Sequence, residues 1–196
     1  MENSKTEPCR CRWCNLKNPL YVEYHDREWG VLNPDEQYLF EMLILESFQA
    51  GLSWECVLNK REHFREVFCN FDLESVTNFD EGKLSKMLAD PGLIRNRLKL
   101  RAAVTNARIF RELQKEFGSF GAYLKSFCGD RILYETGLTV NPVSDAISKD
   151  LRKRGMKFCG STIIYAYLQA VGLINSHEPG CFLAHSGKER HSRVHP

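Results

Sequence analysis

The chain has 196 residues, which is the size of a single domain. Hydrophobic residues make up 43% and charged residues 27% of it, and these values exclude a disordered, collagen-like or coiled-coil chain. The longest apolar run, residues 163–174, is too short to cross a bilayer, and no apolar segment follows the polar residues 1–5. We therefore expect one cytoplasmic domain over residues 1–196, with a core over 8–183, a disordered tail over 184–196 and no membrane association.

Charge is segregated along the chain, although the net charge is only +2. Residues 62–90 hold seven acidic and three basic residues, whereas residues 92–111 hold six basic residues and no acidic one. For binding a polyanion, the distribution of charge matters more than its sum. The basic segment therefore keeps nucleic acid open as a partner.

Hydrophobic periodicity and helix-capping residues predict a succession of helices, with no alternation of strand and helix. The predicted helices cover residues 34–50, 53–68, 73–78, 83–89, 92–117, 119–127, 144–155 and 161–172. Ser144 is the expected N-cap of its helix, and Gly155 is the expected C-terminal glycine. Residues 130–141 have a β-like composition but are short, so we predict a loop there. The predicted fold class is all-α.

The helix predicted over residues 34–50 is apolar nearly all round, which indicates a buried central helix. Glu46 lies within this apolar surface, where an unpaired carboxylate is costly. Two interpretations stay open from this stretch alone. Glu46 is either a structural carboxylate bonded to a neighbouring helix end, or a carboxylate at the floor of a pocket that binds a polar ligand.

Large aromatic residues are concentrated near the start of the chain. Trp13, Tyr21, Tyr24 and Trp29 lie close together in sequence, and Trp54 is the third tryptophan. Such a group is ordinarily part of a core, but it also has the composition of a stacking site for a planar ligand such as a nucleobase.

Residues 89–95, Ala-Asp-Pro-Gly-Leu-Ile-Arg, resemble a helix-hairpin-helix element. In that element a glycine turn and the following helix N-terminus direct backbone N–H groups at a phosphate. The alternative is a Pro-Gly helix break followed by a solvated basic face. The six basic residues behind the turn favour the phosphate anchor.

Two histidines and several cysteines have positions that allow a metal site. His177 and Cys181 are four residues apart, and Cys11 and His25 lie at the other end of the chain. Two Cys and two His are a sufficient tetrahedral set for Zn²⁺, and such a site would tie the two chain ends together. Four unrelated residues are the alternative, and spacing does not exclude Cys9 or Cys14 in place of Cys11.

Several ungapped motifs, in order, resemble the DNA-3-methyladenine glycosylase I (Tag) family, a divergent branch of the helix-hairpin-helix glycosylases. They are RCRW at 10–13, PLYVEYHDREWGV at 19–31, LFEMLILESFQAGLSW at 39–54, DPGLIRNRLKLRAAVTNAR at 90–108, SDAISKDLRKRGMKFCGSTIIYAYLQAVGLINSH at 144–177, and GC at 180–181. The resemblance implies a helical glycosylase-like domain that excises 3-methyladenine from double-stranded DNA containing alkylated bases. It points to no protein partner.

The resemblance also implies a role for individual residues. Glu46 would bind the base and is the candidate catalytic carboxylate, since residues 117–125 lack the acidic residue that many relatives in the wider superfamily use. Whether Glu46 acts directly in catalysis or only binds the base stays open. The remaining implied residues are Tyr24, Trp54, Trp13, Tyr21 and Trp29 for the base; Gly51, Leu52, Gly92, Arg95 and Arg97 for DNA; and Cys11, His25, His177 and Cys181 for one structural Zn²⁺.

Two other functions compete with excision. A non-catalytic, zinc-stapled module that recognises DNA damage would keep the hairpin and the zinc set but would not need Glu46 in an apolar helix. A nucleobase deaminase needs an H-x-E motif, a P-C-x-x-C motif and an open metal position, and residues 177–179 lack such a partner motif.

Overall fold

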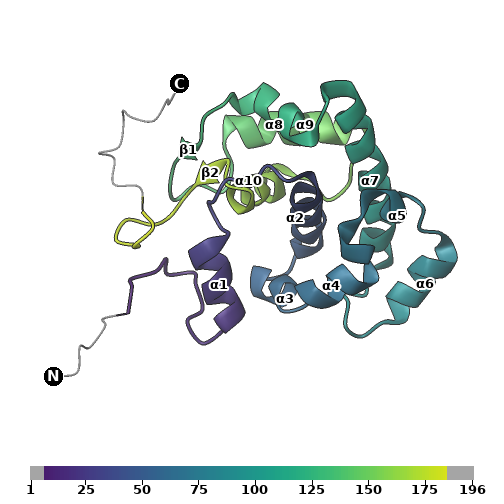
Figure 1. The fold of residues 1–196 in the computed structure, drawn as a ribbon, viewed down its shortest axis with the longest axis horizontal. Helices are drawn as coiled ribbons and strands as arrows, with labels where there is room; N and C mark the ends of the chain where they lie inside the picture. The colour runs from purple at the N-terminus through teal and green to yellow at the C-terminus, as the bar shows by residue number, and fades with distance from the viewer. Residues whose placement is uncertain (1–6, 185–196) are drawn as a thin grey trace.

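The computed structural model describes residues 7–184, and Figure 1 shows helices surrounding the central helix α2. Residues 1–6 lie outside the described part of the chain, as do residues 185–196 of the tail expected over 184–196. The elements in chain order are α1 (Pro19–Arg27), α2 (Glu36–Gln49), α3 (Trp54–Leu58), α4 (Arg61–Val67), a 3₁₀ turn (Cys69–Phe71), α5 (Leu73–Thr77), α6 (Glu81–Ala89), α7 (Arg97–Phe117), α8 (Phe120–Cys128), β1 (Leu133–Tyr134), α9 (Pro142–Lys153), α10 (Ser161–Ala170) and β2 (Ile174–Asn175).

Helix α2 is the buried centre of the fold. The Asp35 side chain caps its first turn by accepting from the N–H of Tyr38. Every residue from 39 to 48 is buried, and helices α3, α7, α8 and α10 pack around it. Burial of each large apolar side chain contributes about 1.5–3 kcal/mol, so this helix organises the core. The prediction of a central buried helix that contains Glu46 is confirmed.

The structure differs from the predicted helices at several points, and the helix expected over residues 92–117 begins at Arg97. The helix expected over residues 53–68 is two helices, α3 and α4, interrupted at residues 59–60. The break turns Lys60 toward the 90–96 turn, where its Nζ donates to the carbonyl oxygens of Pro91 and Gly92. Helix α1 was not predicted, although Asn18 caps it and Pro19 opens it, which is an ordinary helix start.

The segment predicted as a loop contains a short strand. Leu133 and Tyr134 form β1, which pairs in parallel with β2 near the other end of the described chain. The cap of α9 is Asn141, whereas Ser144 completes a capping box from the third helical position. The fold is nevertheless predominantly helical. None of the helices described between residues 7 and 184 is long and apolar enough to span a membrane.

The two ends of the described chain lie side by side. The N–H of Phe182 donates to the carbonyl oxygen of Cys9 at 2.8 Å, and both segments leave the same side of the molecule in Figure 1. This contact brings the segment before α1 against the segment after β2. The fold therefore places the N-terminal and C-terminal Cys and His residues next to each other.

Candidate active site

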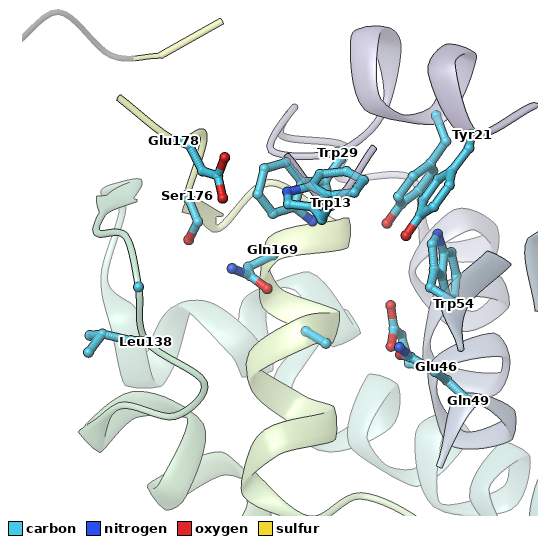
Figure 2. Close-up of a pocket in the computed structure, with 13 residues that line it drawn as sticks. Trp13, Tyr21, Trp29, Glu46, Gln49, Trp54, Leu138, Gln169, Ser176 and Glu178 are labelled. Atoms are coloured by element: carbon cyan, nitrogen blue, oxygen red, sulfur yellow. The ribbon is translucent and has the colours of Figure 1, made fainter. Parts of the chain in front are cut away.

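A cavity of about 270 Å³ lies beside the C-terminal half of α2 and receives side chains from α1, α3 and α10. Figure 2 shows Tyr21, Trp54 and Glu46 along one side of it, and Ser176 and Glu178 at the opposite end. All six residues that the sequence resemblance implies for base binding line this cavity: Trp13, Tyr21, Tyr24, Trp29, Glu46 and Trp54.

Glu46 lies at the cavity wall without a protein partner. Its side chain is 3% exposed, and its Oε2 atom is buried with no hydrogen bond among the described residues. Burial alone raises the pKa of Glu46 to about 8, so the carboxyl group is protonated at neutral pH. The structural interpretation required a bond to a neighbouring helix end, and no such bond is present in the described part of the chain. A ligand in the cavity would supply the missing partner.

Tyr24 and Trp54 form one continuous aromatic surface beside Glu46. Their ring centroids are 5.2 Å apart and the planes are inclined by 45°. A planar base between two parallel rings needs about 7 Å, twice a contact distance of ~3.5 Å. The two rings are therefore too close to enclose a planar ligand between them, and they present one shared aromatic surface to the cavity. Within the described part of the chain, the buried Nε1 of Trp54 lacks an acceptor, so Trp54 and Glu46 both carry unsatisfied polar atoms beside the cavity.

The cavity also contains polar residues that the sequence interpretation missed. They are Gln49, Gln169, Ser176 and Glu178. Gln49 lies one turn after Glu46 on α2, so helical periodicity provided a signal for it. The others come from α10 and the segment after it, and only the packing of α10 against α2 places them at the cavity.

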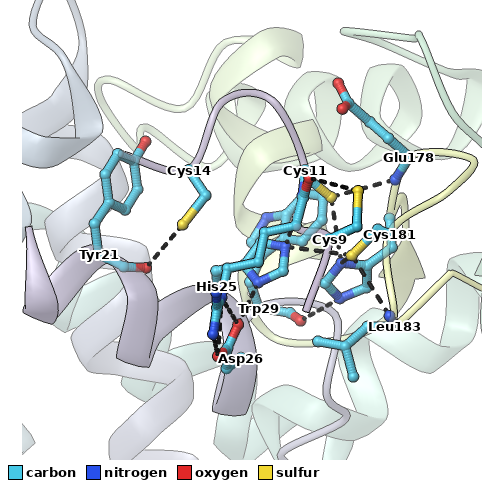
Figure 3. A network of polar contacts seen from close by, with 12 residues as sticks. Cys9, Cys11, Cys14, Tyr21, His25, Asp26, Trp29, Glu178, Cys181 and Leu183 are labelled. Atoms are coloured by element: carbon cyan, nitrogen blue, oxygen red, sulfur yellow. Dashed lines mark hydrogen bonds and ion pairs between the residues drawn. The ribbon is translucent and has the colours of Figure 1, made fainter. Parts of the chain in front are cut away.

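A buried cluster of Cys11, His25, His177 and Cys181 lies against the aromatic wall of the cavity, which Trp13 and Trp29 form (Figure 3). The four ligand atoms lie within 4.8 Å of one another. Sγ of Cys181 is 3.5 Å from Nε2 of His25 and 3.6 Å from Nδ1 of His177, and Sγ of Cys11 is 3.5 Å from the same Nδ1. This group is able to hold a metal ion.

The competing cysteines are not members of this cluster. Cys9 is exposed, and the thiol of Cys14 points to the carbonyl oxygen of Tyr21 at 3.8 Å. Among the three N-terminal cysteines, the structure therefore brings only Cys11 into contact with His177 and Cys181.

Hydrogen bonds orient both histidines toward the cluster. His25 Nδ1 bonds to Asp26 Oδ1 at 2.7 Å, and Nε2 of His177 donates to the Trp29 carbonyl oxygen at 3.2 Å. Arg10 donates to both oxygens of Asp26 and holds the pKa of that carboxyl group below its usual value. Such bonds fix the ring orientation and turn the other nitrogen toward the cysteine sulfurs. In this structure Nε2 of His25 also accepts a hydrogen bond from the N–H of Cys11 at 3.2 Å.

The turn between α6 and α7 is tightly packed. The N–H of Gly92 donates to Oδ1 of Asp90, so it is already satisfied within the protein. A Cβ atom added to Gly92 would lie 2.3 Å from Cδ2 of His63. His63 is held there by bonds to Asp90 and Glu66. The position requires glycine because the imidazole approaches the backbone so closely.

The outer side of this turn is open. Within residues 7–184, the backbone N–H groups of Ile94 and Arg95 have no acceptor. Arg95 and Arg97 are exposed, and Arg97 lies 3.8 Å from Glu81. The remaining basic residues of this segment bond to acidic groups or carbonyl oxygens of the protein: Lys99, Arg101, Arg108 and Arg111. Glu74 and Glu81 of the acidic segment therefore pair with arginines of the basic segment.

The loop between α2 and α3 presents an apolar side chain to solvent. Gly51 has φ +80°, a left-handed conformation that favours glycine. Leu52 follows it and is 41% exposed, with its N–H donating to the carbonyl oxygen of Gln49. The loop is next to the cavity because Gln49 and Trp54, on either side of it, both line that cavity.

Comparison with known proteins assigns the chain to a class. A profile described as methyladenine glycosylase matches residues 13–184. DNA-3-methyladenine glycosylase 1 of Escherichia coli (strain K12) is 42% identical over 178 residues, which are 88% of this chain and 95% of that protein. A crystal structure of 3-methyladenine DNA glycosylase I matches with a TM-score of 0.86 at 41% identity, covering 90% of this chain and 100% of the other.

A structure of the Staphylococcus aureus enzyme, which addresses its recognition of 3-methyladenine, matches with a TM-score of 0.82 at 32% identity over 90% of this chain and 95% of that one. The fold is thus that of a DNA N-glycosylase, a hydrolase of the bond between base and sugar. The chain belongs to the methyladenine glycosylase family, as the sequence motifs indicated.

Proposed function

We propose that this protein excises 3-methyladenine from alkylated double-stranded DNA by hydrolysing the N-glycosidic bond. The observation that carries the proposal is Glu46, a buried carboxyl group without a partner in the aromatic cavity of a methyladenine glycosylase. Membership of this family favours excision over a module that only binds damage. A DNA substrate agrees with the cytoplasmic location expected from the sequence.

The chemistry of the cavity suits a flipped base. An adenine methylated at N3 carries positive charge in DNA and leaves the sugar easily, so the protein must extrude it, recognise it and admit water. Aromatic faces such as those of Tyr24 and Trp54 attract a cationic ring. A cation beside Glu46 favours the ionised carboxylate, which accepts hydrogen bonds from the base edge. Base recognition is therefore the primary role of Glu46 in this proposal.

The Cys11, His25, His177 and Cys181 cluster would hold one structural Zn²⁺. A tetrahedral ion with Zn–S of ~2.3 Å and Zn–N of ~2.0–2.1 Å has S···N edges of about 3.5 Å. The three S···N distances of 3.5, 3.5 and 3.6 Å agree with that edge. Four protein donors fill a tetrahedral shell, so the ion would stabilise the fold and the aromatic wall.

DNA would be held by the outer side of the α6–α7 turn and probed by the loop after α2. The free N–H groups of Ile94 and Arg95, together with the exposed guanidinium groups of Arg95 and Arg97, are suited to a backbone phosphate. Gly92 contributes by allowing the turn to pack against His63. Leu52 would enter the base stack opposite the flipped nucleotide, as apolar wedges do.

Chromatography of bases released from methylated duplex DNA tests the function directly. The protein should release 3-methyladenine faster than a protein-free sample, without magnesium or a nucleotide, and binding should weaken with salt. Binding of methylated DNA without release above the protein-free rate would instead support the damage-recognition module. Release of other bases only would also contradict the proposal.

A further inference from the structure

We propose that Lys99 is a positioning residue that locks the stack-probing loop of residues 50–52 to the phosphate-binding turn. This inference rests on the proposed function, because it assigns Lys99 to the step in which duplex DNA is engaged. Lys99 lies in the first turn of α7, directly after the α6–α7 turn, whereas the loop follows α2. The two elements are far apart in sequence.

The ammonium group of Lys99 is bonded to the end of α2. Its Nζ donates to the carbonyl oxygen of Phe48 at 2.8 Å and to that of Ala50 at 2.6 Å. The side chain is buried with 6% exposure, and no carboxylate faces it among the described residues. The ring of Phe158 lies 5.8 Å from Nζ on another side. Lys99 is thus a buried cation whose hydrogen bonds go only to backbone carbonyl oxygens.

This arrangement satisfies two carbonyl oxygens at the C-terminal end of α2. The last carbonyl oxygens of a helix have no partner within it, and a cation at that end bonds to them and opposes the helix dipole. Helix α2 ends at Gln49 and passes into the left-handed Gly51. Lys99 therefore fixes the backbone on the last turn before Leu52, the side chain that would enter the DNA stack.

The positions of Glu46 and Trp54 do not depend on the same bonds, whereas Gln49, which also lines the cavity, lies between Phe48 and Ala50. Glu46 lies one turn earlier on α2, within the packed core of the helix. Trp54 begins α3, whose first turn is capped separately by Ser53. Loss of the Lys99 bonds should therefore disturb the position of Leu52 much more than the wall formed by Glu46 and Trp54.

Lys99 is also held on the side of the phosphate-binding turn. The side chain of Asn96 accepts hydrogen bonds from the N–H groups of Leu98 and Lys99, which anchors the start of α7. On the opposite side of the turn, Lys60 donates to the carbonyl oxygens of Pro91 and Gly92. Phosphate capture at Ile94 and Arg95 would therefore be transmitted through one rigid unit to the loop that probes the stack.

The test compares Lys99→Met with Lys115→Met. Lys115 lies on the same helix, its side chain is 63% exposed, and it pairs with Glu112. Its replacement therefore removes one positive charge at a position distant from the turn. Three quantities are measured for each variant and the wild type: affinity for a duplex carrying a tetrahydrofuran abasic-site analogue at several salt concentrations, affinity for free 3-methyladenine, and melting temperature.

We expect Lys99→Met to weaken duplex binding at least tenfold, with free 3-methyladenine affinity within twofold of the wild type. The slope of log affinity against log salt should stay that of the wild type, because Nζ contacts carbonyl oxygens and releases no counterion from DNA. Lys99→Arg, which keeps two donors, should recover at least part of the binding.

Three results would overturn the inference. Equal duplex affinity in Lys99→Met and Lys115→Met would mean that Lys99 positions nothing. A salt slope lowered by about 1 would make Lys99 a phosphate contact. A parallel loss of duplex and free-base affinity with a lower melting temperature would make it a general core residue. If the wild-type protein releases no 3-methyladenine, the proposed function fails, whereas the duplex-binding comparison still tests Lys99.

Discussion

The carbonyl oxygen of Trp29 accepts a hydrogen bond from Nε2 of His177 at 3.2 Å, and the two rings meet edge to face with centroids 4.8 Å apart. Trp29 also lines the cavity and contacts Trp13, whose ring lies 5.2 Å from that of His25. The aromatic wall of the cavity therefore rests directly on the two histidines of the metal-binding cluster. Trp13 and Trp29 are thus the residues through which the cluster contacts the cavity.

Removal of one cluster ligand should lower stability before it alters chemistry. Metal coordination contributes folding free energy, so Cys181→Ser should lower the melting temperature and the yield of soluble protein. Excision per folded molecule should change less, because no cluster atom is placed at the base. Elemental analysis should find one zinc per chain in the wild type and less than one in the variant.

Cys14→Ser is the matched control, since the thiol of Cys14 faces the Tyr21 carbonyl oxygen and not the cluster. It should retain one zinc per chain. Active wild-type protein without any metal would refute the zinc proposal, and loss of zinc in the Cys14 variant would show that Cys14 participates.

Replacement of Glu46 by glutamine keeps its size but removes the charge that a cationic base induces. A hydrogen bond to a charged group contributes about 1.5–3 kcal/mol, so Glu46→Gln should lower base affinity or excision rate by about one to two powers of ten. Titration with 3-methyladenine and a rate measurement on methylated DNA provide the readout. Glu23→Gln, at an exposed ion pair on α1, is the control. Unchanged affinity in Glu46→Gln, combined with a large loss of stability, would identify Glu46 as a core carboxylate.

The pH dependence of stability should also depend on Glu46. Burial raises its pKa in the folded protein from 4.5 to about 8. Between these values the unfolded chain has lost the proton that the folded chain retains, so the free energy of unfolding decreases as pH rises from about 4.5 to about 8. At about 1.4 kcal/mol per pKa unit, the decrease reaches up to about 5 kcal/mol.

Urea unfolding of the wild type and of Glu46→Gln at pH 5, 7 and 9 measures this contribution. Glutamine does not titrate, so the variant should gain stability relative to the wild type as pH rises. Parallel curves for the two proteins would show that Glu46 is ionised in the empty cavity.

The contact between Gly92 and His63 predicts a compensating pair of substitutions. Gly92→Ala places a Cβ 2.3 Å from the imidazole, so it should displace the turn and weaken duplex binding about tenfold or more. His63→Ala removes the obstructing ring, so the double variant should bind DNA better than Gly92→Ala alone. Duplex affinities of the two single variants and the double variant form a thermodynamic cycle. Additive effects would mean that the glycine is required for another reason.

The sequence by itself determined the family, the helical class and the burial of α2. These properties are carried by local patterns: ungapped motifs, helical periodicity and an apolar surface around Glu46. The same patterns named the aromatic residues and Glu46 that line the cavity, because these residues stand in the motifs, but they missed the other polar lining residues. Spacing alone did not distinguish Cys11 from Cys9 or Cys14, because the distance along the sequence does not determine where a side chain points.

Only the tertiary structure decided how distant segments meet. The break between α3 and α4 and the pairing of β1 with β2 depend on partners far along the chain, which periodicity does not record. Gln169 and Glu178 reach the cavity because of how α10 packs against α2. The sequence favoured the basic segment as a phosphate anchor, but within it Arg101 bonds to Glu81 and Lys99 to the end of α2. The partner of a side chain is set by packing in three dimensions. The sequence therefore showed which residues are charged but not which groups they bond to.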